Sequence, residues 1–162
     1  MVRSEEKVKF IVDVMLGRLA NYLLLLGYDC EYRRQFPDKQ LLQLARKENR
    51  IIITRDAELA EQCSESKICY LKTTELLEQL KIVKNKFSLE FTVERLFTRC
   101  TGCNQQLVEL DREEIEAEKI PPRTRSWLQR YFKCPACEKI YWRGTHYQQV
   151  KERLENWGLL DG

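Results

Sequence analysis

Short apolar runs alternate with helical patterns through the first half of this sequence, and that alternation constrains the fold more than any other feature. Residues 8–13 predict a buried strand that ends at an acid, and residues 14–26 follow with apolar side chains at the three-and-four spacing of one helix face. Further strands are predicted over residues 29–32, 51–54 and 67–71. Strands that alternate with helices pair in parallel through right-handed crossovers, so we expect an α/β fold with a parallel sheet flanked by helices.

The remaining helices are predicted from the same spacing. A last helix is expected to begin at Thr145, whose hydroxyl forms a capping box with Gln148. The other helices cover residues 39–49, 57–63, 74–83 and 88–97. Beyond residue 98 the alternation stops. We therefore predict an α/β domain over residues 1–98 and a smaller domain with a C-terminal helix over residues 99–162.

Composition narrows the function classes without choosing among them. The chain has 162 residues, of which 43% are hydrophobic, enough for an ordinary globular core. Charged residues make up 33% and nearly cancel to a net charge of +3, so any nucleic-acid surface must be local. The charged start of the chain argues against a signal peptide, and the longest apolar stretch, residues 23–26, is too short to span a membrane. We expect a soluble, cytoplasmic protein.

Four of the seven cysteines form two Cys-x-x-Cys pairs, which are the strongest single signal in the sequence. Residues 104–133 separate the pairs. Two such pairs supply four thiolates to one tetrahedral Zn²⁺, whereas a redox pair needs no second copy. We predict one structural zinc in a zinc ribbon, held by Cys100, Cys103, Cys134 and Cys137. Four cysteines leave no open coordination position, so this zinc is expected to stabilise the fold and do no chemistry.

A basic stretch rich in aromatic residues lies between and just after the two cysteine pairs. Its cations include Arg123, Arg125 and Arg130, and Glu138 is the one acid within residues 123–143. Positive charge interleaved with aromatic rings is what single-stranded nucleic acid requires of a surface. The alternative is that the rings form the small core of the ribbon and the cations its solvated edge. The residues alone leave both interpretations open.

Three aspartates fall where strands give way to helices. Asp13 ends the first strand, Asp38 begins the second helix, and Asp56 follows the central strand. The carboxyl ends of parallel strands share one edge of a sheet, so these three carboxylates are expected to converge there. Clustered carboxylates repel one another unless a hard cation such as Mg²⁺ or Mn²⁺ lies among their oxygens.

The competing interpretation of these acids is helix capping. Asp38 and Asp56 both precede predicted helices, where aspartate is favoured because it accepts backbone N–H bonds.

Motifs that the sequence lacks reduce the number of reaction types that the chain could catalyse. With a single histidine, His146, the chain cannot build a histidine-pair ribonuclease site, and neither GxxxxGK[ST] nor GxGxxG occurs. Hydrolysis that depends on metal-bound carboxylates is the chemistry that remains.

Several ordered motifs give the chain a specific resemblance to a known family. They are residues 10–20, Leu26-Gly27-Tyr28-Asp29, Asp38 with Leu41-Leu42, Ile52-Ile53-Thr54-Arg55-Asp56, the two cysteine pairs and Tyr141-Trp142-Arg143-Gly144-Thr145-His146. In order and spacing they resemble the Mut-seven carboxy-terminal RNase family, whose members are PIN-like domains with a C-terminal zinc ribbon. The resemblance covers residues 9–157.

The resemblance implies a PIN-like nuclease domain that carries a metal-dependent ribonuclease site. It implies that Asp13, Asp38 and Asp56 are catalytic and hold Mg²⁺ or Mn²⁺, and it favours this role over capping. The expected substrate is single-stranded RNA, with Arg18 and Arg55 against its phosphates and the basic stretch holding the strand. The alternative function is a non-catalytic RNA- or protein-binding module that keeps the fold and the ribbon.

Overall fold

The protein, described here from a computed structural model, consists of two compact units. The structure describes residues 8–64, 67–111, 114, 120–127 and 130–162. The first unit comprises residues 1–24 and 28–89, and the second comprises residues 25–27 and 90–162. A domain boundary at residue 98 stays a prediction.

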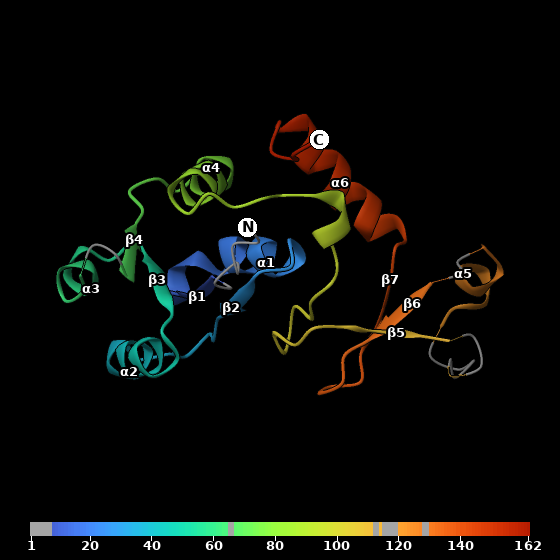
Figure 1. Ribbon diagram of the computed structural model, residues 1–162, viewed down its shortest axis with the longest axis horizontal. Helices are drawn as coiled ribbons and strands as arrows, with labels where there is room; N and C mark the ends of the chain where they lie inside the picture. The colour runs from blue at the N-terminus through green and yellow to red at the C-terminus, as the bar shows by residue number, and fades with distance from the viewer. Residues whose placement is uncertain (1–7, 65–66, 112–113, 115–119, 128–129) are drawn as a thin grey trace, which may run out of the picture. The chain divides into compact units, whose positions relative to one another are not determined.

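The first unit is an α/β sandwich built on a four-stranded sheet (Figure 1). The strand order is β2-β1-β3-β4, and every neighbouring pair is parallel. This confirms the fold class that the alternation of strands and helices predicted. In chain order the elements are β1 (Lys9–Val12), η1 (Val14–Leu16), α1 (Gly17–Leu25), β2 (Asp29–Glu31), α2 (Asp38–Glu48), β3 (Ile51–Thr54), α3 (Ala57–Glu61), β4 (Ile68–Tyr70) and α4 (Leu76–Lys86).

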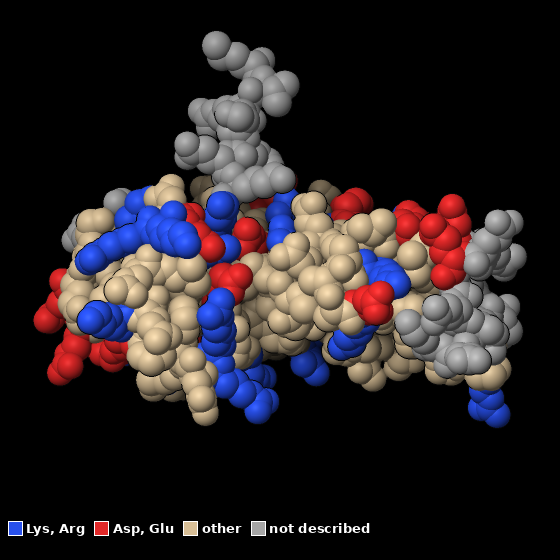
Figure 2. Space-filling view, turned by 90° about the horizontal axis from the view of Figure 1, so that it is seen from below, with Lys and Arg blue, Asp and Glu red and all other residues tan. Residues whose placement is uncertain are grey.

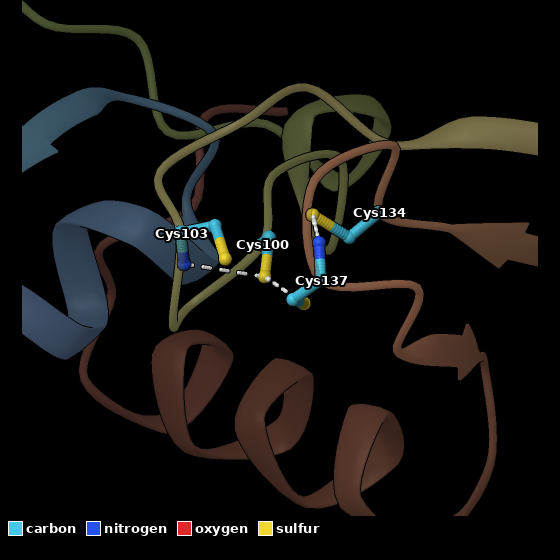
Figure 3. Close-up of side chains that lie close together, drawn as sticks. All are labelled: Cys100, Cys103, Cys134 and Cys137. Atoms are coloured by element: carbon cyan, nitrogen blue, oxygen red, sulfur yellow. Dashed lines mark hydrogen bonds between the residues drawn. The ribbon is translucent and has the colours of Figure 1, made fainter.

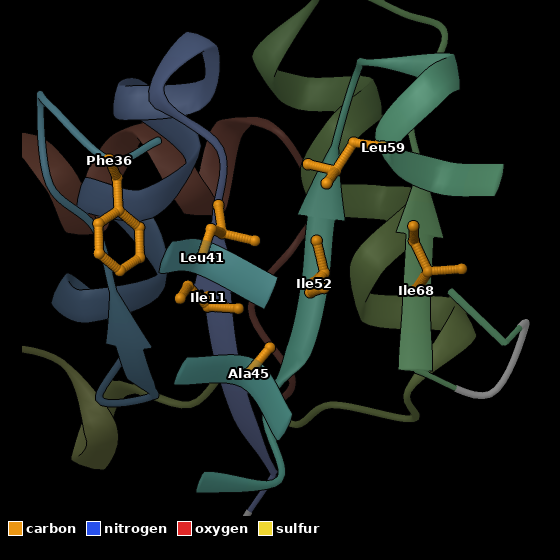
Figure 4. Packing of buried hydrophobic residues seen from close by; sticks show 7 residues of the cluster. All are labelled: Ile11, Phe36, Leu41, Ala45, Ile52, Leu59 and Ile68. Carbon is orange, nitrogen blue, oxygen red and sulfur yellow. The ribbon is translucent and has the colours of Figure 1, made fainter. Parts of the chain in front are cut away.

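Both faces of the parallel sheet are buried under helices. Ile11, Ile52 and Ile68 are register partners on three adjacent strands, so their side chains share one face. Helices α2 and α3 cover this face with Leu41, Ala45 and Leu59 (Figure 4). On the other face Phe10 meets Phe87, at the end of α4, with 5.4 Å between the ring centroids. The runs of consecutive apolar residues in β1 and β3 follow from this two-sided burial.

A buried cation joins three elements at the edge of the sheet where the strands begin. Arg50, the residue before β3, is 6% exposed. Its Nη1 donates to Asp29 Oδ1 at 2.7 Å and to the Phe10 carbonyl at 3.1 Å, and its Nε donates to Glu48. Burial lowers the pKa of Arg50, but the hydrogen bonds and charges of the two carboxylates outweigh it and raise that pKa above its ordinary value. One side chain therefore links β1, β2 and the end of α2.

The second unit carries a three-stranded antiparallel sheet in the order β5-β6-β7. Its elements are η3 (Val93–Arg95), β5 (Val108–Leu110), α5 (Pro122–Trp127), β6 (Tyr131–Lys133), β7 (Ile140–Trp142) and α6 (Thr145–Asn156). In α6 the buried side chains are Tyr147, Val150 and Leu154, which lie on one helical face. Among the described helices of both units, none has the length and apolar character needed to cross a membrane.

The helix predicted over residues 88–97 is wrong. In this segment the structure has the three-residue turn η3, and Ser88 and Phe97 adopt positive φ angles of 50° and 59°. The Phe91 N–H donates to Asp161 Oδ2 at 2.8 Å, and the Asp161 N–H donates to the Phe91 carbonyl at 2.7 Å. Leu89, Phe91, Leu96 and Phe97 are buried and Val93 is half-buried, but on an irregular chain whose backbone groups find partners elsewhere.

The capping box predicted at the start of the last helix is also wrong. α6 begins at Thr145, but its N-cap is Gly144, and no side-chain cap bond forms there. A Cβ on Gly144 would approach Trp142 Nε1 to 2.7 Å. Close packing of the Trp142 ring against the backbone therefore explains why a glycine occupies the cap position, where a side-chain cap is otherwise preferred.

We predict that Arg50→Met destabilises the first unit by about 2–4 kcal/mol, because Asp29 and Glu48 then lose a partner while they remain partly buried. Urea denaturation followed by far-UV circular dichroism measures this change. The three tryptophans, Trp127, Trp142 and Trp157, all belong to the second unit, so their fluorescence reports that unit separately. The exposed Arg34→Met is the matched control and should stay within about 0.5 kcal/mol of wild type. Equal stability of the two variants would contradict the structural role of Arg50.

Candidate acidic site and cysteine metal centre

Two of the three candidate acids are connected at the carboxyl edge of the parallel sheet, where its strands end. Asp13 still pairs with the neighbouring strand, since its N–H donates to the Ile53 carbonyl at 3.0 Å. The Thr54 hydroxyl donates to Asp13 Oδ2 at 2.9 Å, and the same hydroxyl oxygen accepts the Asp56 N–H at 2.9 Å. Thr54 thereby orients the Asp13 carboxylate and fixes the backbone from which Asp56 projects.

The structure confirms that Asp56 caps a helix. Its Oδ1 accepts the N–H groups of Glu58 at 2.9 Å and Leu59 at 3.3 Å, at the start of α3. Capping occupies one carboxylate oxygen. Within the described residues, Asp56 Oδ2 and Asp13 Oδ1 accept no hydrogen bond. Each acid therefore keeps one oxygen that can coordinate a cation.

Asp38 lies beyond the same edge but is not connected to the other two acids. It is the first residue of α2, which follows β2, the neighbour of β1. Pro37 is the N-cap, so a capping role for Asp38 is wrong. Among the described residues, the gathered group of three or more potential metal ligands consists of cysteines, and the three aspartates do not form such a group. The metal role of Asp38 stays a prediction.

Sequence reasoning missed the residues that position these acids. No role is predicted for Thr54 from the sequence, although a hydroxyl two residues before an acid is a local signal. Tyr32, in the loop after β2, donates its hydroxyl to the Val14 carbonyl at 2.9 Å. A Cβ on Gly17 would lie 2.8 Å from the Tyr32 oxygen. Gly17 therefore leaves the space that lets this tyrosine hold the turn following Asp13.

The four cysteines of the second unit meet from two loops (Figure 3). Cys100 and Cys103 precede β5, and Cys134 and Cys137 lie between β6 and β7. All four sulfurs lie within 4.8 Å of one another, and Cys100 Sγ is 3.8 Å from Cys137 Sγ. A tetrahedral zinc with Zn–S bonds of about 2.3 Å separates its sulfurs by about 3.8 Å. The quartet therefore fits one zinc ion.

The two cysteine loops have the same backbone geometry. The Cys103 N–H points to Cys100 Sγ at 3.4 Å, and the corresponding distance in the second pair is 3.5 Å. The residue after each pair, Asn104 or Glu138, has a positive φ of 58° or 64°. In both loops its N–H donates to the carbonyl of the first cysteine at 3.0 Å. A left-handed conformation is unfavourable for Glu138, and its repetition indicates loops shaped to present sulfur atoms.

A tyrosine hydroxyl supports the cysteine quartet from outside. Tyr141 Oη lies 3.1 Å from Cys100 Sγ. Burial raises the pKa of the Cys100 thiol, but hydrogen bonds, that of Tyr141 foremost, lower it to about 7. Burial, together with the contact to Cys100, raises the pKa of Tyr141 to about 12, so its hydroxyl stays protonated and donates to the thiolate. The hydrogen bond with Cys137 raises the pKa of Cys103 to about 12. All four cysteines can therefore be thiolates together only when a cation lies among their sulfur atoms.

The basic stretch of the second unit is partly neutralised. Arg130 donates to both carboxylate oxygens of Glu109, from Nε at 2.7 Å and from Nη2 at 3.0 Å. Glu109 lies on β5, outside the stretch in which Glu138 is the one acid, so sequence reasoning missed it. Arg123 is exposed, and the side chain of Arg125 lies outside the described residues. On the face shown in Figure 2, basic and acidic side chains are interspersed.

Comparison with known proteins identifies the family. The model of the Mut7-C RNAse domain matches residues 8–154, a range that contains Asp13, Asp56 and both cysteine pairs. Searches of curated proteins and of solved structures return no match. The family model spans almost the whole sequence, including both units. The chain therefore belongs to the Mut7-C RNAse domain family.

Proposed function

We propose that this protein is a metal-dependent ribonuclease that hydrolyses single-stranded RNA at the carboxyl edge of its parallel sheet. Membership of an RNase family supports the reaction class. The observation that supports the location best is the Thr54 hydroxyl, which bonds to Asp13 and to the backbone of Asp56 while each acid keeps an oxygen. Carboxylate oxygens suit Mg²⁺ or Mn²⁺, which when bound orients a phosphodiester and lowers the pKa of a water molecule.

The proposed reaction is in-line attack of water on phosphorus. A bond forms between the water oxygen and phosphorus, and the bond to the 3′ oxygen breaks. The attacking water loses one proton and the departing 3′ oxygen takes up one proton, which leaves a 5′-phosphate and a 3′-hydroxyl. Asp13 and Asp56 contribute the metal-facing oxygens, and Thr54 holds Asp13 in one orientation. In this proposal Asp38 adds a third carboxylate from the start of α2.

Two arginines close in sequence to the acids would hold the substrate. Arg18 is exposed on α1, and Arg55 lies between Thr54 and Asp56. In the described part of the chain, neither arginine forms an ion pair with an acid. Both therefore remain available for flanking phosphates, which position an RNA strand without reading its sequence. In the second unit Arg123, Arg125 and Arg130 would contribute further phosphate contacts, with Arg130 shared with Glu109.

We also propose that the ion of the cysteine quartet is zinc and that it is structural. Four sulfurs at tetrahedral spacing leave no position for water or substrate. Its contribution is to the stability of the second unit, whose three strands are each three residues long.

A second candidate function is a non-catalytic RNA- or protein-binding module. The observation that favours it is that the three aspartates do not form a gathered group of ligands. Such a module would keep the fold and the cysteine centre but would cleave no RNA. Substitution of the acids distinguishes the two functions, because it reduces RNA cleavage only if the protein is a nuclease.

We predict that Asp13→Asn and Asp56→Asn each reduce cleavage of single-stranded RNA in Mg²⁺ or Mn²⁺ by about 100-fold or more, since an amide oxygen is a weaker ligand for a hard cation. Asparagine caps helices as well as aspartate does. Asp56→Asn should therefore unfold within about 0.5 kcal/mol of wild type, which separates the catalytic role from the capping role.

The control for these substitutions is Glu61→Gln, an exposed acid at the last position of α3, which should leave cleavage unchanged. Cleavage should be started by adding Mg²⁺ rather than stopped with a strong chelator, because a chelator also competes for the cysteine-bound ion. Undiminished cleavage by both folded aspartate variants would refute the proposed site. If wild type cleaves nothing but binds RNA, and binding weakens in Arg123→Ala, the binding module is supported.

We predict one zinc per chain and its loss as pH falls. The cysteine ligands bind as thiolates, so protons compete with the ion, and lowering the pH weakens binding. Cys134→Ser should lower the zinc content and unfold the second unit, seen as a change in tryptophan fluorescence, while far-UV circular dichroism retains the signal of the first unit. Elemental analysis that finds no zinc in the purified protein would contradict this prediction.

We predict that Tyr141→Phe weakens metal retention by about 10- to 100-fold, the usual effect of removing a hydrogen bond to a metal ligand. The measurement is the rate of transfer of the bound ion to a chromophoric chelator. With Co²⁺ in the centre, the sulfur-to-metal charge-transfer bands should also shift. Tyr131→Phe is the matched control, because its hydroxyl donates to the Thr124 carbonyl at 3.4 Å rather than to sulfur. Equal transfer rates in the two variants would exclude the proposed role of Tyr141.

A further inference from the structure

The exposed ring of Tyr70 lies in the same row of side chains across the sheet as Asp13 and Thr54 of the acidic site. Ile11, Ile52 and Ile68 share the face of the sheet covered by α2 and α3 (Figure 4). Side chains two residues further along each strand return to the same face. In β3 and β4 these residues are Thr54 and Tyr70, which are register partners, and the Leu71 N–H donates to the Thr54 carbonyl at 2.8 Å beyond them.

Asp13 occupies the same position in the row on the other side of Thr54, as their 2.9 Å side-chain hydrogen bond shows. The row at the carboxyl edge is therefore Asp13, Thr54 and Tyr70 on three neighbouring strands. Adjacent strands lie about 4.8 Å apart, so the backbones of Asp13 and Tyr70 are separated by about 10 Å. The row therefore spans two strand spacings, from Asp13 through Thr54 to Tyr70.

Exposure changes sharply along this row. Thr54 is fully buried and Asp13 is 6% exposed, whereas Tyr70 is 40% exposed. A single exposed aromatic residue on a surface needs no explanation by itself. This one stands in line with two buried polar groups, and Lys72, two residues later, is also exposed. An accessible ring and a nearby cation in the chain are the groups that bind a nucleobase and its phosphate.

We propose that Tyr70 stacks on a nucleobase of the RNA strand that crosses the acids and that this contact makes the site prefer unpaired bases. The inference rests on the proposed ribonuclease function and adds a specificity-determining residue to it. In a duplex each base is already stacked and paired, so its face is unavailable to a protein ring. A single strand presents that face freely, and stacking on it tolerates any base.

The test combines substitution of Tyr70 with removal of single bases from the RNA. Binding of a synthetic unstructured RNA is measured in the Asp56→Asn background, and cleavage is measured without that change. Tyr70→Ala should weaken binding and raise KM by about 5- to 100-fold, with a smaller change in kcat. Tyr70→Phe, which keeps the ring, should restore both values. The preference for single strand over duplex should fall in Tyr70→Ala and return in Tyr70→Phe.

Abasic substitution identifies the contact itself. In wild type, one abasic position in the RNA should weaken binding by a similar factor, and in Tyr70→Ala the same position should have no further effect, as expected for two groups that contact each other. Ile82→Ala is the matched control. Ile82 is 39% exposed but lies within α4, so its loss should change neither binding nor KM.

The outcomes separate this inference from the proposed function. If wild type cleaves RNA but Tyr70→Ala behaves like Ile82→Ala, the nuclease stands and the role of Tyr70 is refuted. If wild type cleaves nothing, the proposed function fails, and the abasic binding series still decides whether Tyr70 contacts a base. Additive effects of the abasic position and of Tyr70→Ala would overturn the inference. Circular dichroism verifies that each variant is folded.

Discussion

The parallel pairing of β1 with β3 is the constraint on which the acidic edge depends. The register sets Ile11 against Ile52 and Val12 against Ile53, and the next residues in line are Asp13 and Thr54. A slip of one residue would turn one set of side chains to the opposite face and break the contact between Asp13 and Thr54. Burial of the isoleucine row under α2 and α3 makes such a slip costly. The apolar core therefore sets the geometry of the polar edge.

Local sequence patterns predicted most of the helices and strands. The features that they did not predict depend on contacts between residues distant in sequence. Three strands of the parallel sheet, β1, β3 and β4, lie in short apolar runs, and the two cysteine pairs identify their own loops, so these elements could be predicted from the sequence. Strand β2 has acids at two of its three positions, Asp29 and Glu31, and has no such run. The apolar side chains of residues 88–97 fit a helix as well as they fit an irregular segment that pairs with Asp161, and no local pattern distinguishes the two. The partner of Asp13 is Thr54, 41 residues away, which a single sequence does not indicate.

The cysteine centre and the acidic edge are built by opposite means. At the acidic edge, packed strands and helices hold a few polar groups in place. In the second unit, the residues of β5 and β7 are exposed or half-buried, and Val108 is 56% exposed. Strands this short bury little apolar area, so in the proposed zinc centre the ligation of the metal by the two loops would supply stability that the small sheet lacks. The left-handed residues Asn104 and Glu138 are the local cost of presenting four sulfurs to one point.

Capping and catalysis are compatible roles for Asp56. A carboxylate that is free to rotate must lose side-chain entropy when it binds a cation, whereas the two N–H bonds to Asp56 Oδ1 have already fixed its orientation. The Thr54 hydroxyl acts on the Asp13 carboxylate in the same way. In the proposed site both acids are therefore preorganised by contacts made during folding, and the oxygen that each leaves unbonded is the one available for chemistry. The capping role of Asp56 therefore supports its proposed role as a metal ligand, because the N–H bonds that make it a cap also hold its carboxylate in place.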